Sequence, residues 1–228
     1  ADDPQASPEW SSVLGSALEV LGDLRAREVY QEGIDRGCVR CYEDLGLWFK
    51  RQGMKLDSEN TMDEGMRHKC AACYAVLYDY SQEEFKKRTP ELKLSFYNYV
   101  CDHWSKGAEL GDDFCAYLLG SAIYFGNYGF KRNAREGTSW LLRAVELGSS
   151  SACVMIAAIL ECNASKQDWR DAAYYHLKAL RYGDQDELDA VIEAYEKGYL
   201  EPYRDEIEQY WLPYPDDEPS DGRWDAYV

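Results

Sequence analysis

Two Cys-x-x-Cys pairs are the side chains with the most evident chemistry in this sequence. They are Cys38 with Cys41 and Cys70 with Cys73. Four thiolates at this spacing could hold a structural zinc ion. One pair at a helix N-terminus could instead be redox-active, because the helix dipole lowers a thiol pKa. The pairs could also form disulfides between neighbouring elements, or stay reduced in a core. We favour disulfides, and no thioredoxin-like alternation of strands and helices supports the redox alternative.

The other four cysteines are disulfide candidates as well. Cys101 and Cys115 flank a glycine-containing turn, so a bond between two antiparallel helices is geometrically reasonable. Cys153 and Cys162 would lie about 13 Å apart on an unbroken helix, too far for a bond that needs Cα atoms within about 7 Å. Either that helix ends early or these two pair elsewhere. Eight cysteines in one chain indicate an oxidising compartment.

No catalytic or cofactor motif accompanies these thiols. The three histidines, His68, His103 and His176, are not at metal-ligand spacing. The sequence also lacks a Gly-x-Ser-x-Gly elbow, a His-Glu-x-x-His helix and a phosphate-binding loop. We therefore predict a protein that is not an enzyme and that has no metal site, no catalytic residue and no cofactor.

Charge and hydropathy limit the partners. The formal charge of −17 argues against nucleic acids and anionic membrane surfaces, and is compatible with a basic partner. No apolar run is long enough to cross a bilayer, so we expect no membrane insertion. The chain begins with Ala1 and Asp2 rather than Met, as an exported chain does after its signal peptide is removed. We expect a periplasmic protein.

Helical patterns broken by glycine must position these side chains. In the clearest segment, Gly111 ends one helix and Asp112 caps the next. A turn at Gly126 to Gly129 then reverses the chain, and a second helix runs to Gly148. The sequence therefore predicts a helix-turn-helix unit, and an all-α chain built from such units.

This segment resembles the Sel-one-like repeats, relatives of the tetratricopeptide repeats. Gly111, Cys115, Leu119 and Gly120 match the family pattern, in which a small residue follows the first glycine by four positions. The same pattern recurs almost as well from Gly37 and less completely from other first positions, at unequal spacings of 32 to 42 residues. The resemblance implies a right-handed α/α superhelical solenoid of about five divergent repeats with a C-terminal extension. The first positions are Gly37, Lys69, Gly111, Gly148 and Gly183.

We divide the chain into three parts. Residues 1–19 are an N-terminal segment, 20–198 the repeats, and 199–228 a C-terminal cap or tail, in which prolines break any long helix. A short capping helix at 201–209 is compatible with the sequence, and the aromatic and acidic residues beyond it suit a cap over the last repeat or a partner contact.

The resemblance implies a protein-binding function, since the concave surface of such solenoids binds proteins or peptides. Acidic periplasmic proteins that look like this one include immunity proteins against type VI secretion effectors, among them phospholipases. A toxin with a positively charged cleft is therefore the expected partner, and an adaptor for a cell-envelope complex is the alternative. Aromatic side chains near equivalent positions are also core residues in this family. The candidate partner-binding residues are Trp48, Tyr78, Tyr124, Tyr128, Tyr214, Asp216, Asp217 and Glu218.

Overall fold

The computed structural model describes residues 7–75, 89–163 and 165–210, and it divides into two compact units. Unit 1 comprises Ala1–Gly148 and unit 2 comprises Ser149–Val228. All regular elements of the described residues are helices, and within each unit they pack as antiparallel neighbours along the chain. The prediction of an all-α solenoid is confirmed. None of the described helices is long and apolar enough to cross a membrane.

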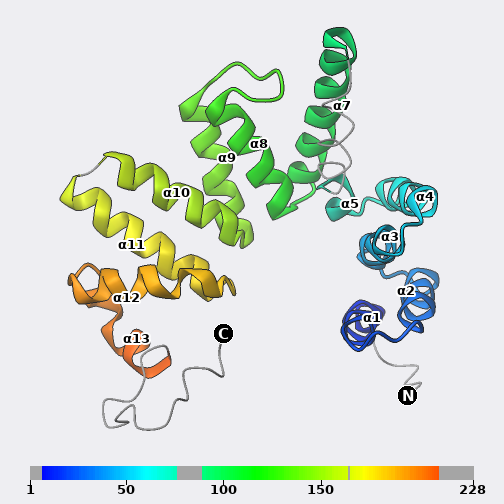
Figure 1. Ribbon diagram of the computed structural model, residues 1–228, viewed down its shortest axis with the longest axis horizontal. Coiled ribbons are helices and arrows are strands. Elements are labelled where there is room, and N and C mark those ends of the chain that lie inside the picture. Colours follow the sequence, from blue (N-terminus) through cyan, green and yellow to red (C-terminus); the bar gives the residue numbers. More distant parts are fainter. Residues whose placement is uncertain (1–6, 76–88, 164, 211–228) are drawn as a thin grey trace. The chain divides into compact units, whose positions relative to one another are not determined.

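Unit 1 is a series of helical hairpins (Figure 1). Helix α1 pairs with α2, α3 with α4, and α8 with α9, while α5 packs on α7. The first helices of successive hairpins also contact one another, as α1 does with α3. Each hairpin therefore covers its neighbour, as the repeat architecture requires. The helices are α1 (Trp10–Val20), α2 (Ala26–Asp35), α3 (Cys41–Arg51), α4 (Lys55–Arg67), α5 (Ala71–Ala75), α7 (Pro90–Glu109), α8 (Asp113–Phe125) and α9 (Ala134–Leu147).

Left-handed turn residues set the register of the repeats. Gly37, Gly111, Gly148 and Gly183 all have φ between 93° and 104° and stand shortly before the first helix of a hairpin. Lys69 occupies the same position with φ of 61°, although a side chain disfavours this conformation. The five predicted first positions of the repeat are thus confirmed as turns, including the one that lacks glycine.

Helix α8 is capped at both ends by the residues that the sequence predicts. The Asp112 carboxylate accepts a hydrogen bond from the Cys115 backbone N–H at 2.6 Å, and Gly126 ends α8 in the left-handed conformation. A side-chain cap of this kind contributes about 1 kcal/mol. These contacts fix where α8 begins and ends.

Helices of successive hairpins in unit 1 meet where a cysteine packs on a glycine. A Cβ atom on Gly33 would lie 2.6 Å from Cys41 Sγ, and one on Gly65 would lie 2.5 Å from Cys73 Sγ. The next repeat has the same relation between Gly107 and Cys115. Only glycine allows this approach, because real Cβ contacts are never so short. We call these three contacts the Cys–Gly seams.

Unit 2 continues the same architecture. Helices α10 and α11 form a hairpin, and α12 packs on α11. Its core is built around Leu177, Val191, Leu200 and Ile207, each fully buried. Ile207 lies on a short helix, and it falls within residues 201–209, where the sequence is compatible with a capping helix. The elements are α10 (Ser150–Asn163), α11 (Lys166–Arg181), η1 (Gln185–Glu187), α12 (Leu188–Glu196), η2 (Glu201–Tyr203) and α13 (Arg204–Tyr210).

Helix α1 begins and nearly ends within the segment 1–19 that we separated from the repeats, and it forms a hairpin with α2. The boundaries at residues 20 and 198 stay predictions, as does the right-handed twist of the solenoid.

Candidate binding pocket

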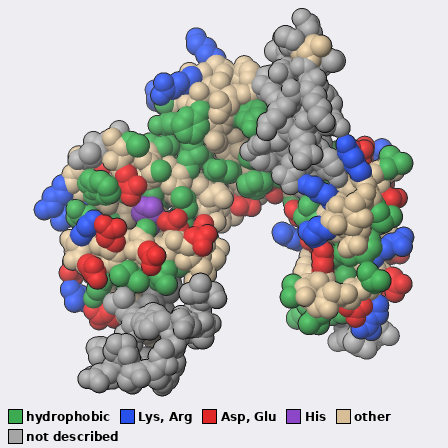
Figure 2. Space-filling model, viewed as in Figure 1, with side chains coloured by type: hydrophobic (Ala, Val, Ile, Leu, Met, Phe, Trp, Pro, Cys, Tyr) green, Lys and Arg blue, Asp and Glu red, His purple; other side chains and the backbone are tan. Residues whose placement is uncertain are grey.

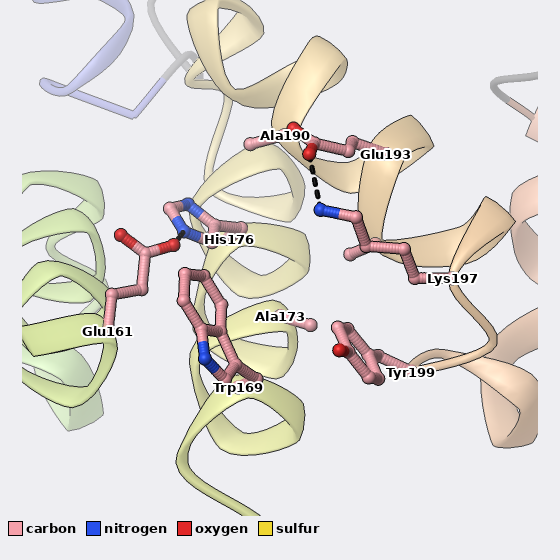
Figure 3. A pocket seen from close by; sticks show the side chains of 9 residues that line it. Glu161, Trp169, Ala173, His176, Ala190, Glu193, Lys197 and Tyr199 are labelled. Carbon is pink, nitrogen blue, oxygen red and sulfur yellow. Dashed lines mark hydrogen bonds and ion pairs between the residues drawn. The ribbon is translucent and has the colours of Figure 1, made fainter. Parts of the chain in front are cut away.

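A small pocket lies in unit 2, where α11 and α12 face each other and α10 adds one side chain (Figure 3). Trp169, Ala173 and His176 follow one another at helical spacing on α11, so they share a face. Ala190, Glu193 and Ala194 share the side of α12 that faces them, also at helical spacing. The lining residues are Glu161, Trp169, Ala173, His176, Ala190, Glu193, Ala194, Lys197 and Tyr199.

Small residues make the hollow and aromatic residues border it. Alanine at 173, 190 and 194 leaves a volume of about 60 Å³ between the helices. Trp169 is 37% exposed and offers a ring beside the opening, with Tyr199 near it (Figure 3). Pockets for cofactors and drug-sized ligands have volumes of roughly 300 to 1,000 Å³. This pocket therefore suits one side chain of a partner rather than a cofactor.

His176 connects three elements beside the pocket. Its Nε2 atom lies 3.1 Å from Glu161 Oε1 on α10, and its Nδ1 atom is hydrogen-bonded to Glu187 Oε2 on η1. A neutral imidazole donates from one nitrogen only, whereas an imidazolium donates from both. Both ring nitrogens of His176 are thus held by carboxylate oxygens. The His176 side chain is largely buried, at 13% exposed, so the bridge holds its ring in one orientation.

The opening carries more negative than positive charge. Lys197 pairs with Glu193 one turn earlier on α12, and both side chains are at least half exposed. Such an exposed pair contributes little stability and can exchange partners. Thirteen acidic and six basic residues lie between positions 149 and 210. Figure 2 shows acidic side chains gathered over α11 and α12, so this face attracts cations.

The cysteines are all thiols in this structure. The pairs Cys38 with Cys41 and Cys70 with Cys73 lie at the starts of the first helices of adjacent repeats, as expected, and all four are buried. Among the described residues no group of three or more His, Cys, Asp or Glu side chains could hold a metal ion. Disulfide formation stays a prediction.

Most of the thiols are poor nucleophiles. Burial raises the pKa values of Cys41 and Cys115, and raises the pKa of Cys153 to about 11. A hydrogen bond between the thiols of Cys70 and Cys73 lowers the pKa of Cys70 and raises that of Cys73.

The remaining cysteines bear on the predicted pairings. Cys153 and Cys162 share the unbroken helix α10, which excludes a bond between them. Cys101 donates from Sγ to the Tyr128 carbonyl oxygen at 3.6 Å, while Cys115 packs on Gly107. Cys101 and Cys115 therefore contact different partners, and their pairing stays a prediction.

The aromatic residues that we predicted to bind a partner lie in different environments. Trp48 is buried in unit 1 and packs edge-to-face on Phe49, so it serves the core, the alternative that the sequence left open. Tyr124 and Tyr128 are half-buried, and Tyr128 packs on Trp104. The other candidates lie outside the described residues: Tyr78, Tyr214, Asp216, Asp217 and Glu218.

The sequence reasoning missed the residues of the pocket. Trp169, Ala173 and His176 have the spacing of a single helical face, which could have indicated their proximity. Glu187 stands where the repeat pattern expects a small residue, four positions after Gly183. An acidic residue at such a position was a signal that its carboxylate has a specific partner.

Comparison with known proteins identifies the fold. The crystal structure of a Sel1 repeat protein from Oxalobacter formigenes superposes with a TM-score of 0.60 at 15% identity, covering 89% of this chain and 88% of that one. A protective antigen of uropathogenic Escherichia coli with an SLR fold aligns with a TM-score of 0.41 at 19% identity, over 86% of this chain and 50% of the other. No family model and no curated protein matches the sequence. The chain thus has the fold of Sel1 repeat proteins.

Proposed function

We propose that this chain is a non-catalytic protein-binding solenoid whose pocket in unit 2 receives a basic side chain of a protein partner. The pocket itself is the observation that carries the proposal. It combines an aromatic wall, an alanine floor and carboxylates in a volume that fits one side chain. Binding surfaces commonly place their strongest contacts in pockets that enclose a single anchor residue.

A lysine or arginine is the anchor that these walls favour. The Trp169 ring can stack on a cation, and Glu161, whose side chain is 36% exposed, can pair with it. Glu193 can exchange its contact with Lys197 for one with the partner. An arginine suits the site better than a lysine, because a planar guanidinium can stack and donate two hydrogen bonds at once.

The finer proposal is that the partner is a secreted toxin with a positively charged cleft. A chain of charge −17 is attracted to such a cleft and reaches it faster through long-range steering. A phospholipase effector of a type VI secretion system is the best candidate, since its cleft must attract anionic phosphodiesters. The chain would then be a periplasmic immunity protein that blocks the toxin.

Co-expression with a secreted effector from the genomic neighbourhood of this gene tests the proposal. We expect a one-to-one complex and rescue of the cells from toxicity. We expect Trp169→Ala to weaken the affinity about 30-fold, the usual effect of losing a central aromatic anchor. Glu161→Lys should weaken it further by placing a like charge beside the incoming cation.

Two exposed residues of unit 1 provide matched controls. Phe114→Ala removes an aromatic ring of similar exposure, and Glu146→Lys makes the same charge change on α9. Both variants should bind like the unmodified chain. No complex and no rescue would exclude the toxin, and a complex unaffected by Trp169→Ala would exclude the pocket. A stable complex with a cell-envelope protein instead would favour the adaptor alternative.

A further inference from the structure

In the first helix of unit 1, small and polar residues are buried while large apolar residues are exposed. Helix α1 buries Ser11, Ser12 and Gly15, whereas Trp10 and Leu14 are exposed. An exposed helix face is normally polar, because it faces solvent. Apart from Leu18, which is partly buried against the core, the apolar residues of α1 face outward, and the residues that it buries fully are polar or small. The outer surface of α1 is therefore built to be covered.

The inward face of α1 is fixed by close contacts, so the helix cannot turn its apolar side inward. Gly15 lies directly under the Tyr30 ring, where a Cβ atom would overlap it. A Cβ on Gly33 of α2 would lie 2.6 Å from Ser11 Cβ. Side chains as large as Leu14 or Trp10 do not fit at these contacts.

The exposed side chains form a stripe that matches another helix. Trp10, Val13, Ala17 and Val20 recur on α1 at alternating spacings of three and four residues. This is the spacing with which one helix packs along another. Leu14 and Leu21 widen the stripe, and its exposed fractions reach 61% at Trp10, 79% at Leu21 and 88% at Val20. A continuous apolar surface of this extent often marks an interaction site.

We propose that a second copy of this chain covers the stripe, with the two α1 helices antiparallel about a two-fold axis. Glu9 directly precedes α1, and Arg25 stands just beyond its C-terminal turn, after Gly22 and Asp23. Antiparallel pairing brings Glu9 of each copy toward Arg25 of the other. The Arg25 side chain is 72% exposed beside its own Asp23 and keeps room for a further acceptor. The two helix dipoles also oppose each other favourably in this arrangement.

The side-chain sizes fit the same arrangement. When Trp10 lies opposite Leu21 of the other copy, Leu14 falls opposite Ala17, so a large residue meets a small one. The stripe offers roughly 600 Å² per copy, somewhat below the 800 Å² of a standard interface. The dimer is accordingly weak, with a dissociation constant on the order of micromolar.

Sedimentation velocity of the full chain from 1 to 200 µM tests this inference. We expect the mass to rise from monomer to dimer across this range. Leu14→Glu should raise the dissociation constant at least 100-fold, because it buries a charge at the centre of the stripe. Leu56→Glu is the matched control, since Leu56 on α4 is even more exposed than Leu14 but lies outside the stripe, and this variant should dimerise normally.

A charge exchange tests the orientation. Glu9→Arg and Arg25→Glu should each weaken the dimer several-fold, and the double variant should recover most of the loss. A chain that stays monomeric at 200 µM overturns the inference, as does a dimer insensitive to Leu14→Glu. A dimer without recovery in the double variant overturns the antiparallel arrangement. Because the stripe lies in unit 1, these outcomes are independent of toxin binding through unit 2.

Discussion

Unit 1 and unit 2 use the same position of the repeat for opposite purposes. Four residues after the left-handed turn, unit 1 places Cys41, Cys73 and Cys115, whereas unit 2 places Ala152 and then, after Gly183, Glu187. The cysteines are almost fully buried and pack on glycines. Glu187 instead pairs with His176 beside a pocket. One position thus makes a dry seam in one unit and a polar bridge in the other.

The difference shows how a repeat acquires a site. A thiol on a glycine leaves no space, so the Cys–Gly seams serve packing alone. A carboxylate at the same position needs a donor, and the helix that supplies His176 also supplies the wall and part of the floor of the pocket. The pocket of unit 2 thus adjoins the residue that breaks the repeat pattern.

The largest effect is expected at a Cys–Gly seam. Gly107→Ala should destabilise the protein by about 3 kcal/mol, because the new methyl group would overlap Sγ and Cβ of the buried Cys115. Calorimetry should show a melting temperature lower by roughly 6 to 12 °C.

Adding Cys115→Ala to this variant should restore much of the stability, because it removes the overlapping sulfur. Alanine already stands at both equivalent positions, Ala144 and Ala152, later in the chain. If Gly107→Ala alone leaves the melting temperature unchanged, the seam is looser than the structure shows.

The next largest effect concerns Glu43 of unit 1, whose carboxyl lacks, among the described residues, a hydrogen-bond partner of the kind that His176 provides to Glu187. Glu43 Oε2 is buried and accepts no hydrogen bond from the described residues. Burial raises the pKa of Glu43 to about 7, although Arg40 opposes the rise. The folded chain thus binds a proton more tightly than the unfolded chain, whose carboxyl titrates near 4.5. Stability therefore falls as the pH rises from 4.5 to 7.

Glu43→Gln removes this dependence. The variant should be more stable than the unmodified chain by about 2 kcal/mol at pH 8.5, and equally stable below pH 4.5. Chemical denaturation at both pH values measures the difference. An equal gain at the two pH values would contradict the assignment of the effect to ionisation.

A smaller effect is expected from the polar bridge of unit 2. A double-mutant cycle with His176→Phe and Glu187→Leu should give a coupling energy of about 1 kcal/mol, because each single variant leaves the other partner without its hydrogen bond. The cycle with Glu161→Leu should give less, since the Glu161 side chain is more exposed than that of Glu187. Equal coupling in the two cycles would count against Glu187 as the main partner.

How far the sequence predicts this molecule depends on the range of the interactions. The turns at Gly111 and Gly126 and the cap at Asp112 were predictable, because each depends on residues a few positions apart. The seams were predictable in outline, since a small residue recurs four positions after the turn. The contact of Gly107 with Cys115 was not, because helix rotation is set by packing across hairpins.

The candidate site was predicted less well for the same reason. Trp48 has an aromatic ring at a suitable repeat position, but burial among neighbouring helices decides that it serves the core. His176 was interpreted as one of three isolated histidines, because its partners Glu161 and Glu187 lie 15 and 11 residues away in the sequence. Periodicity indicates which residues share a face, but it does not indicate which faces meet.

The smallest effect tests whether the repeat position alone determines the turn. Lys69 has φ of 61° where four other repeats have glycine. A left-handed conformation costs a residue with a Cβ atom about 1 kcal/mol, and glycine loses part of that advantage through its greater freedom in the unfolded chain. Lys69→Gly should therefore stabilise the protein by about 0.5 kcal/mol. The reciprocal change, Gly37→Lys, should destabilise it by a similar amount, since nothing lies within 4 Å of a Cβ at that position and only the backbone is strained. Denaturant midpoints that shift in the same direction for both variants would show that side-chain contacts at residue 69 determine its conformation, rather than the repeat position that it shares with Gly37.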